Sequence, residues 1–279
     1  MNFSNWYFSK ERVISFPSHD RGGGKSWSLV ALGGYAVRLG FNVVHYTLEL
    51  GEDYVGKRYD SFFTKIPVTK IQSFREKVEE TIPQLPGELI IKEFPTGRAT
   101  MSTIESHLKK VKDMGINADL VIIDYVDLLS GRKKTRERKD EIDDIYTSAK
   151  GLARQLNIPI WSVSQVNRAG AQDKIIEGDK AAGSYDKMMI SDFAMSLSRK
   201  KEDKVNGTGR FHTMKNRYGM DGLTFSVKAD TSTGHFEVFD YQDSEETTSP
   251  PKTQSNVFDT DVDRFDKQLL RKKFFELEK

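Results

Sequence analysis

Near the start of the sequence, consecutive glycines lead into a lysine and a serine, a combination suited to holding phosphate groups. The stretch reads Arg21, Gly22, Gly23, Gly24, Lys25, Ser26 and Trp27. Glycines let backbone N–H groups surround phosphate oxygens at a helix start, while Lys25 reaches the β- and γ-phosphates and the Ser26 hydroxyl binds Mg²⁺. We therefore predict a nucleotide site that takes ATP with Mg²⁺. The usual pattern has glycine where this chain has His19, so a glycine-rich turn before an ordinary helix is the alternative.

An acid, Asp124, directly follows the apolar run Leu120–Ile123. Such a run is typical of a strand buried on both faces, and a carboxylate at its end is placed to hold Mg²⁺ through water. The alternative for Asp124 is a carboxylate that caps the following turn. Asp127 is a weaker second candidate, because it falls past the apolar run.

Two more polar residues close apolar runs, Glu49 after Val43–Leu48 and Gln165 after Trp161–Ser164. Glu49 fits the group that orients or deprotonates an attacking water, although a solvated glutamate at a helix start is the alternative. Gln165 supplies a neutral amide that would sense the γ-phosphate. Since the carboxyl ends of parallel strands meet at one sheet edge, we expect these side chains to converge on one site.

The elements that must position these residues follow an alternating pattern, in which short apolar runs alternate with segments of helical period. The expected parallel strands are Val13–Phe16, Asn42–Thr47, Glu88–Phe94, Leu120–Tyr125, Ile160–Gln165 and Phe193–Ser198. A helix that reaches about Leu39 is expected after the phosphate loop, and further helices are expected over Met101–Val111 and Ile142–Leu156. Further runs at Arg210–Lys215, Leu223–Ala229 and His235–Tyr241 are separated by turns that contain glycine. The sequence predicts an α/β fold with a mostly parallel sheet flanked by helices and an antiparallel β extension.

The composition changes after the last expected strand. We predict one domain over residues 1–242 and a flexible linker rich in Ser, Thr, Glu and Pro over residues 243–257. Residues 258–279 have apolar side chains at roughly helical spacing among charges, which predicts an amphipathic C-terminal tail helix. It would pack on its own domain or a neighbouring subunit, dock on a separate partner, or remain disordered.

Composition narrows the protein class but not the activity. The 279 residues include 43 basic and 41 acidic side chains, so nucleic-acid binding cannot be inferred from the net charge of +2. The chain has no cysteine, which excludes disulfides and cysteine-bound metals. Because no apolar run is long enough to span a membrane and no signal peptide is recognisable, we expect a cytoplasmic protein without a membrane partner.

Taken together, these motifs resemble the RecA-like ATPase domain of DnaB-type replicative helicases, especially the bacteriophage versions. Five stretches match in order: the phosphate loop through Lys25 and Ser26, residues 46–50 (Tyr-Thr-Leu-Glu-Leu), residues 122–129 (Ile-Ile-Asp-Tyr-Val-Asp-Leu-Leu), residues 164–168 (Ser-Gln-Val-Asn-Arg) and residues 214–219 (Met-Lys-Asn-Arg-Tyr-Gly). A phosphate loop alone is a weak signal. The Asp-Tyr pair and the Lys-x-Arg-x-Gly stretch are more discriminating.

The resemblance implies a Mg²⁺-dependent ATP hydrolase that moves along single-stranded DNA as a ring, a hexamer in this family. Glu49 would be the catalytic base, and Gln165 the sensor that couples nucleotide state to DNA. Lys215 and Arg217 would reach the nucleotide site of the neighbouring subunit and stabilise charge there. Read without the family, these two residues form only a basic turn between strands.

The resemblance also implies where DNA and partner proteins bind. DNA-contacting loops would lie over residues 167–189, with Arg168, Lys174, Lys180 and Lys187 as the phosphate contacts. An ordinary surface loop is the alternative. The basic run Arg132–Lys139 is another candidate, although charge runs are usually only solvated. A primase or a helicase loader is the expected partner protein.

Two other functions remain open from the sequence. A RecA-like recombinase or another filament-forming, DNA-dependent ATPase would share the same core. A nucleotide-binding interaction module without turnover would keep the phosphate loop but not need Glu49.

Overall fold

The computed structural model describes residues 13–18, 24–131, 138–165 and 185–241. The predicted linker and the amphipathic segment over residues 243–279 lie outside the described residues, so the predicted domain limits remain predictions. Within the described ranges, no helix is both long and apolar enough to cross a membrane.

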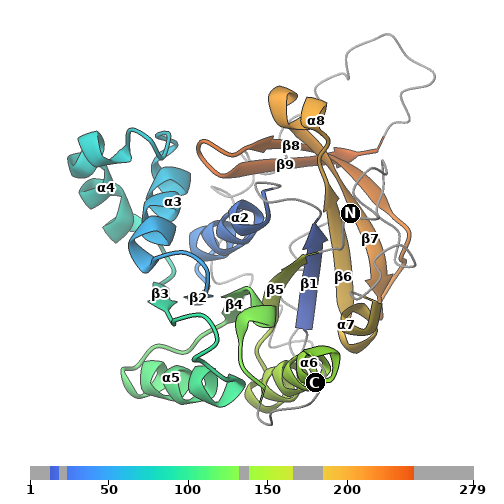
Figure 1. Ribbon diagram of the computed structural model, residues 1–279. Helices are drawn as coiled ribbons and strands as arrows, with labels where there is room; N and C mark the ends of the chain where they lie inside the picture. Colours follow the sequence, from blue (N-terminus) through green and yellow to red (C-terminus); the bar gives the residue numbers. More distant parts are fainter. Residues whose placement is uncertain (1–12, 19–23, 132–137, 166–184, 242–279) are drawn as a thin grey trace, which may run out of the picture.

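One sheet organises the described chain (Figure 1). Its strands are β1 (Val13–Ser18), β2 (Val43–Thr47), β3 (Leu89–Glu93), β4 (Leu120–Asp124), β5 (Ile160–Gln165), β6 (Phe193–Ser198), β7 (Thr208–Asn216), β8 (Thr224–Asp230) and β9 (His235–Asp240). They lie in the order β3-β2-β4-β5-β1-β6-β7-β8-β9. Pairing is parallel from β3 through β6 and antiparallel from β6 through β9. This is the predicted α/β sheet with its antiparallel extension.

Helices cover both faces of the parallel part (Figure 1). They are α2 (Lys25–Arg38), α3 (Glu52–Thr64), α4 (Arg75–Thr81), α5 (Met101–Asp113), α6 (Arg138–Leu156), α7 (Tyr185–Ile190) and α8 (Lys201–Asn206), with short 3₁₀ turns η1 (Ile71–Phe74), η2 (Ile82–Gln84) and η3 (Val126–Leu128). One core joins α2 and α3 to the sheet and to the β8–β9 hairpin, and a second core joins α5 and α6 to the opposite face.

Strand β4 explains why the continuous apolar runs form the centre of the sheet. Leu120 and Ile122 belong to the core under α2 and α3, whereas Val121 and Ile123 belong to the core under α5 and α6. Successive side chains of a strand point to opposite faces, so a strand covered on both sides must be apolar at every position. Asp124 is the first polar residue of this strand, and it stands at its carboxyl end.

Helix α3 packs closely on α2 because α2 carries two adjacent glycines. A Cβ atom at Gly34 would lie 2.3 Å from the Phe62 ring, and one at Gly33 would lie 2.2 Å from the Tyr59 hydroxyl. This close packing holds the second half of α3 against the second half of α2.

Candidate nucleotide site

The sheet register brings the predicted strand ends to one edge. Thr47, the last residue of β2, pairs with Asp124, and the Leu48 N–H donates to the Asp124 carbonyl at 2.8 Å. Ser18, the last residue of β1, pairs with Gln165 at the end of β5. The backbones that lead to Glu49, Asp124, Gln165 and the phosphate loop therefore reach the same side of the sheet, as the sequence predicts.

Helix α2 begins at this edge. Its N-cap, Gly24, has φ = 93°, a left-handed conformation that side chains other than glycine rarely adopt. Lys25 and Ser26 form the first turn, which contains no acidic residue. The helix start thus presents backbone N–H groups and a lysine to an anion. Arg21, Gly22 and Gly23 lie outside the described residues.

Asp124 is 1% exposed, and neither of its carboxylate oxygens makes a hydrogen bond of normal geometry within the described residues. Burial raises its pKa, and the Glu49 charge adds to this, while the Ser26 hydroxyl and the charges of Arg58 and Lys25 act in the opposite direction. A buried carboxylate without a partner favours a cation next to it. The peptide bond from Asp124 to Tyr125 is cis.

These features fit Mg²⁺, which takes oxygen ligands and is usually held by one or two protein groups, phosphate oxygens and water. No cluster of three metal-ligating side chains occurs among the described residues. A magnesium ion here would therefore depend on Asp124, Ser26 and the nucleotide together.

Glu49 lies on an exposed turn immediately after β2, and hydrogen bonds around it fix its backbone. The Thr47 hydroxyl donates to the Leu50 carbonyl at 2.7 Å and accepts from the Leu50 N–H at 3.2 Å. The Thr96 hydroxyl donates to the Leu48 carbonyl at 2.5 Å. The turn is therefore held on both sides of Glu49, while its carboxylate faces solvent.

Trp27 and Arg58 form a contact that the sequence did not predict. The Arg58 guanidinium lies 4.8 Å from the ring centroid of Trp27 and 4.8 Å from that of Tyr54. A Cβ atom at Gly234 would approach the Trp27 ring to 2.8 Å, so the β8–β9 turn packs on the same ring. Trp27, predicted to bind the nucleotide, thus packs against Arg58 and Gly234. The only hint in the sequence is the spacing of four residues between Tyr54 and Arg58, which places both on one side of a helix.

The structure places Lys187 where it cannot serve as a DNA contact. Its side chain is buried, and its Nζ lies 2.5 Å from Asp127 Oδ2 and 3.0 Å from the Ser164 hydroxyl. Asp127 also accepts from the Ser164 hydroxyl at Oδ2 and from the Tyr146 hydroxyl at Oδ1, each at 3.0 Å. This corrects two expectations, because Lys187 is not free for a phosphate and Asp127 is already neutralised by a cation.

Lys215 and Arg217 lie at the other edge of the sheet. Lys215 pairs with Ala194 near the start of β6, a strand parallel to β1, so it lies at the edge opposite the phosphate loop. Its Nζ donates to the carbonyls of Met188 and Met189 at 3.0 and 2.6 Å. Burial lowers its pKa, as do the charges of Arg217 and Lys150.

Arg217 is partly exposed, and its Nη1 lies 3.5 Å from Asp192 Oδ1. Asp192 is 1% exposed and also binds Lys150 Nζ at 2.6 Å. Two cations thus share one buried carboxylate, and Arg217 holds the longer and more exposed contact of the two.

Several predicted residues lie outside what the structure describes. These are Arg168, Lys174 and Lys180, the side chain of Gln165, and residues 132–137 of the basic run. The next residue of that run, Arg138, lies at the start of α6, where it pairs with Glu141 at 2.5 Å and donates to the Asp127 carbonyl.

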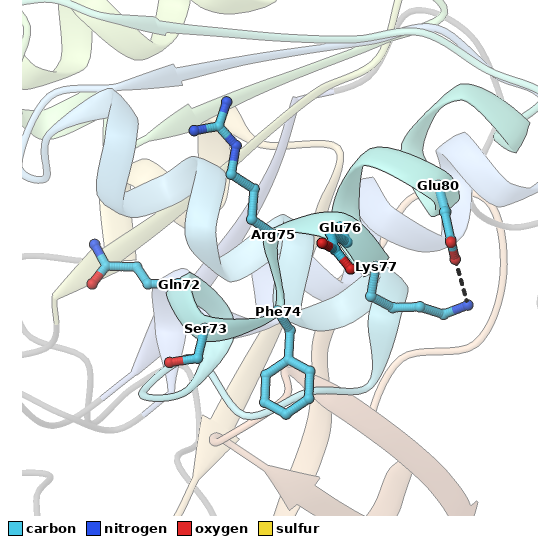
Figure 2. A pocket seen from close by; sticks show the side chains of 7 residues that line it. All are labelled: Gln72, Ser73, Phe74, Arg75, Glu76, Lys77 and Glu80. Carbon is cyan, nitrogen blue, oxygen red and sulfur yellow. Dashed lines mark hydrogen bonds and ion pairs between the residues drawn. The ribbon is translucent and has the colours of Figure 1, made fainter.

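A surface hollow of about 430 Å³ lies away from this site, on η1 and α4 (Figure 2). Its lining residues are Gln72, Ser73, Phe74, Arg75, Glu76, Lys77 and Glu80. The exposed ion pair between Lys77 and Glu80 at 3.3 Å spans part of it. It contains none of the predicted site residues and lacks a buried polar group that would orient a ligand.

Comparison with known proteins gives a consistent result. Residues 22–224 match the family model for the DnaB-like helicase C-terminal domain. The chain is 24% identical over 212 residues to the DnaB-like replicative helicase of Enterobacteria phage T4, covering 70% of this chain and 44% of the relative. It is 30% identical over 133 residues to the replicative DNA helicase DnaB of Helicobacter pylori, covering 46% of this chain and 27% of the relative. The chain therefore spans less than half the length of these relatives.

Two solved structures resemble the described chain. The ATPase domain of G40P gives a TM-score of 0.70 at 21% identity, over 84% of this chain and 86% of that one. The structure of a DnaB-like replicative helicase and its interactions with primase gives a TM-score of 0.70 at 20% identity, over 84% of this chain and 60% of that one. These likenesses confirm the predicted RecA-like fold class.

Proposed function

Because the chain belongs to the family of DnaB-like helicase C-terminal domains, we propose that it is the ATP-driven motor of a replicative DNA helicase. The observation that carries the proposal is the meeting of strand ends at one edge, where the buried Asp124 carboxylate makes no hydrogen bond of normal geometry among the described residues. Such a carboxylate suits a nucleotide-bound Mg²⁺ rather than a structural role. As a replication protein it would work in the cytoplasm, that of the host if a phage encodes it.

In this proposal the side chains divide the work of hydrolysis. The α2 N-terminus and Lys25 bind the phosphates, and Ser26 and Asp124 hold Mg²⁺, which supplies positive charge to the phosphate oxygens. Glu49 orients the attacking water and accepts its proton. Gln165 contacts the γ-phosphate and links its presence to the chain that follows β5.

Lys215 and Arg217 would complete the site of a neighbouring subunit. They lie at the sheet edge opposite their own phosphate loop. The two edges are separated by at least the length of β6, which has six residues. At about 3.3 Å per residue this is roughly 20 Å, too far for either side chain to reach its own nucleotide. A head-to-tail ring, a hexamer as in the family, would bring each pair to the next subunit's site.

Single-stranded DNA would bind in the centre of this ring. Arg168, Lys174 and Lys180 remain the proposed phosphate contacts, and Lys187 is left out because it pairs with Asp127. Contacts to phosphates rather than bases give sequence-tolerant, salt-dependent binding. A primase is the proposed protein partner, because the helicase in one similar structure was solved with its interactions with primase; a helicase loader is the alternative.

The test is a fork-unwinding assay with the wild-type chain and the Lys25→Ala and Glu49→Gln variants, with ATP hydrolysis measured in parallel. We expect single-stranded DNA to stimulate hydrolysis, and both variants to lose hydrolysis and unwinding while Glu49→Gln still binds nucleotide. Equal unwinding by wild type and Lys25→Ala would refute a motor role. Helical filaments in place of closed rings under the electron microscope would favour the recombinase alternative.

A further inference from the structure

A buried triangle of polar groups stands at the end of β5 and has no role in the site as described so far. Lys187 Nζ lies 2.5 Å from Asp127 Oδ2 and 3.0 Å from the Ser164 hydroxyl. The Ser164 hydroxyl donates to the same Asp127 oxygen at 3.0 Å. Ser164 directly precedes Gln165, the last residue of β5, so the triangle holds the backbone beside the proposed γ-phosphate sensor.

The triangle belongs to a frame that joins the ends of β4 and β5. Asp127 lies in η3, the turn that follows β4. On the same turn the Val126 N–H donates to the Ser162 hydroxyl at 3.0 Å, and this hydroxyl donates to the Ile123 carbonyl at 2.8 Å. Two serines of β5 thus bind the end of β4, and Lys187 attaches α7 to the frame that they form.

Further contacts fix α7, which lies beside α6 (Figure 1). The Lys150 ammonium of α6 donates to the Ile190 carbonyl at 2.9 Å, and the Ser191 hydroxyl donates to the Lys187 carbonyl at 2.8 Å. The short helix is therefore bound to the strand ends through Lys187 and to α6 through its last residue.

The buried pair also joins two points that are distant along the chain. Residues 166–184 lie outside the described residues, and they include three of the proposed DNA contacts. This segment follows the end of β5 and precedes the first residue of α7. Because Ser164 and Lys187 meet at 3.0 Å, the described residues on either side of the segment are tied to each other.

A need for stability alone does not account for these polar groups. Replacing a buried ion pair with apolar side chains of similar volume is often neutral or stabilising, because the desolvation of both charges offsets their attraction. What a hydrogen-bonded pair adds is direction, since its bonds form in one arrangement of the elements. Ser164 is 1% exposed, a position where an apolar side chain would pack as well. The triangle therefore indicates a requirement for a fixed geometry between β5 and α7.

We propose that Lys187 is a positioning residue that, together with Asp127, holds the end of β5 through the Ser164 hydroxyl. Gln165 is thereby kept in place for the γ-phosphate, and α7 is tied to it. This inference rests on the proposed function, in which Gln165 contacts the γ-phosphate and the segment before α7 binds DNA. A displacement of the β5 end on loss of the γ-phosphate is then passed to α7, and DNA binding acts on Gln165 through the same contacts in the opposite direction.

The experiment measures how strongly single-stranded DNA stimulates ATP hydrolysis, as the ratio of kcat with saturating oligo-dT to kcat without it. It compares Ser164→Ala, Gln165→Ala and the double variant with the wild type. Ser164→Ala removes the link to β5 but leaves both charges of the ion pair. The matched control is Ser61→Ala, because Ser61 is a buried serine of α3 whose hydroxyl lies 2.5 Å and 3.1 Å from the carbonyls of Ile66 and Ser232.

We expect Ser164→Ala to lower this stimulation ratio by about 2- to 30-fold, the range over which single residues change the coupling between two sites. The KM for ATP should change little, because the residues that bind the phosphates are intact. Gln165→Ala should lose most of the stimulation, and the double variant should lose no more, since Ser164 acts only through Gln165. Ser61→Ala should keep the wild-type ratio.

Each other outcome overturns the inference in a recognisable way. A wild-type ratio in Ser164→Ala beside a lowered ratio in Gln165→Ala would refute the role of the triangle and leave the proposed function intact. A double variant that falls below Gln165→Ala by the full Ser164→Ala factor would mean that Ser164 acts independently. Full stimulation in Gln165→Ala, or none in the wild type, would contradict the proposed function and the inference with it. An equal loss in Ser61→Ala would mean that buried hydroxyls matter only for packing.

A second comparison separates positioning from stability, and it also applies if Ser164→Ala does not fold. Lys187→Met alone takes the paired cation from Asp127 and should lower the unfolding midpoint, whereas adding Asp127→Leu should recover most of it. We expect the stimulation ratio to stay low in this double variant, because the midpoint depends on the charges and the link depends on the hydrogen bonds. A ratio that recovers together with the midpoint would overturn the proposal.

Discussion

The buried ion pair between Lys187 and Asp127 gives a prediction whose size follows from its surroundings. Replacing Lys187 with Met removes the cation 2.5 Å from Asp127 Oδ2, where the two side chains are only 9% and 12% exposed. Among the described residues, Asp127 then keeps hydrogen bonds from the hydroxyls of Tyr146 and Ser164, each at 3.0 Å. The carboxylate is left buried with two neutral donors and without the ion pair to Lys187.

Removing one partner of a buried pair costs about 3–5 kcal/mol. The two remaining hydroxyl bonds compensate in part, at about 1 kcal/mol each, so we expect a loss near the lower end, about 3 kcal/mol. For a domain of this size that corresponds to a fall of the unfolding midpoint of about 6–12 °C. The double variant Lys187→Met, Asp127→Leu removes both charges and should recover most of the loss, because burying an apolar pair costs little.

The control is the exposed pair on α4 in Figure 2. Lys77 and Glu80 lie 3.3 Å apart with 58% and 66% of their side chains exposed, so Lys77→Met should cost at most about 1 kcal/mol. Free energies of unfolding are measured by urea titration, followed by tryptophan fluorescence. If Lys187→Met loses no more stability than Lys77→Met, the reasoning about the buried pair is wrong.

Two further predictions concern the packing behind the site. Burial lowers the pKa of His45 to about 3 from its usual 6.5. As the pH falls, the unfolded chain therefore binds the proton before the folded chain does. The free energy of unfolding then decreases below about pH 6.5, by up to roughly 1.4 kcal/mol per pH unit. Urea titrations at pH 7 and pH 5 should give a smaller pH effect for His45→Gln than for wild type. Gly34→Ala should cost about 1–3 kcal/mol, because the new Cβ would lie 2.3 Å from Phe62. Gly151→Ala, on an open helix face, should be neutral or stabilising in the same assay, and equal effects would contradict this account.

The strands could be predicted because burial on both faces leaves a continuous apolar run in the sequence. Leu120–Asp124 and Phe193–Ser198 are buried at every position, and the predicted bounds agree with the structure within two residues. Helix α3 was not predicted. It contains Gly56 and several charged residues, and its place depends on contacts with Gly33 and Gly34 of α2, which are distant in sequence. Local pattern does not carry such information.

The same limit applies to the site. The glycines, Lys25 and the strand-end acids follow from local spacing, and the register places their backbones at one edge as expected. Lys187 could not be assigned from sequence, because its charge says nothing of a carboxylate 60 residues away. The place of Arg58 between the rings of Trp27 and Tyr54 could not be predicted either, because Trp27 lies on another helix.

The position of Lys215 and Arg217 leads to a prediction about mixed assemblies. If they serve the next subunit's nucleotide, chains with Arg217→Ala and chains with Glu49→Gln are each inactive alone but complement each other when mixed. An interface is active when the Arg217→Ala chain supplies the nucleotide site with its intact Glu49 and the Glu49→Gln chain supplies Arg217. In a random equal mixture this holds for about one quarter of the interfaces. ATP hydrolysis is measured on single-stranded DNA after the chains are mixed and reassembled.

The control pairs Glu49→Gln with Lys25→Ala, which damage the same side of the interface and should not recover. In the proposed ring, Arg217 would exchange a 3.5 Å contact on a carboxylate already bound by Lys150 for a phosphate. Lys215 would gain as well, because burial and neighbouring cations lower its pKa where it lies in the single chain. Recovery no greater than in the control would mean that these two cations act within their own chain.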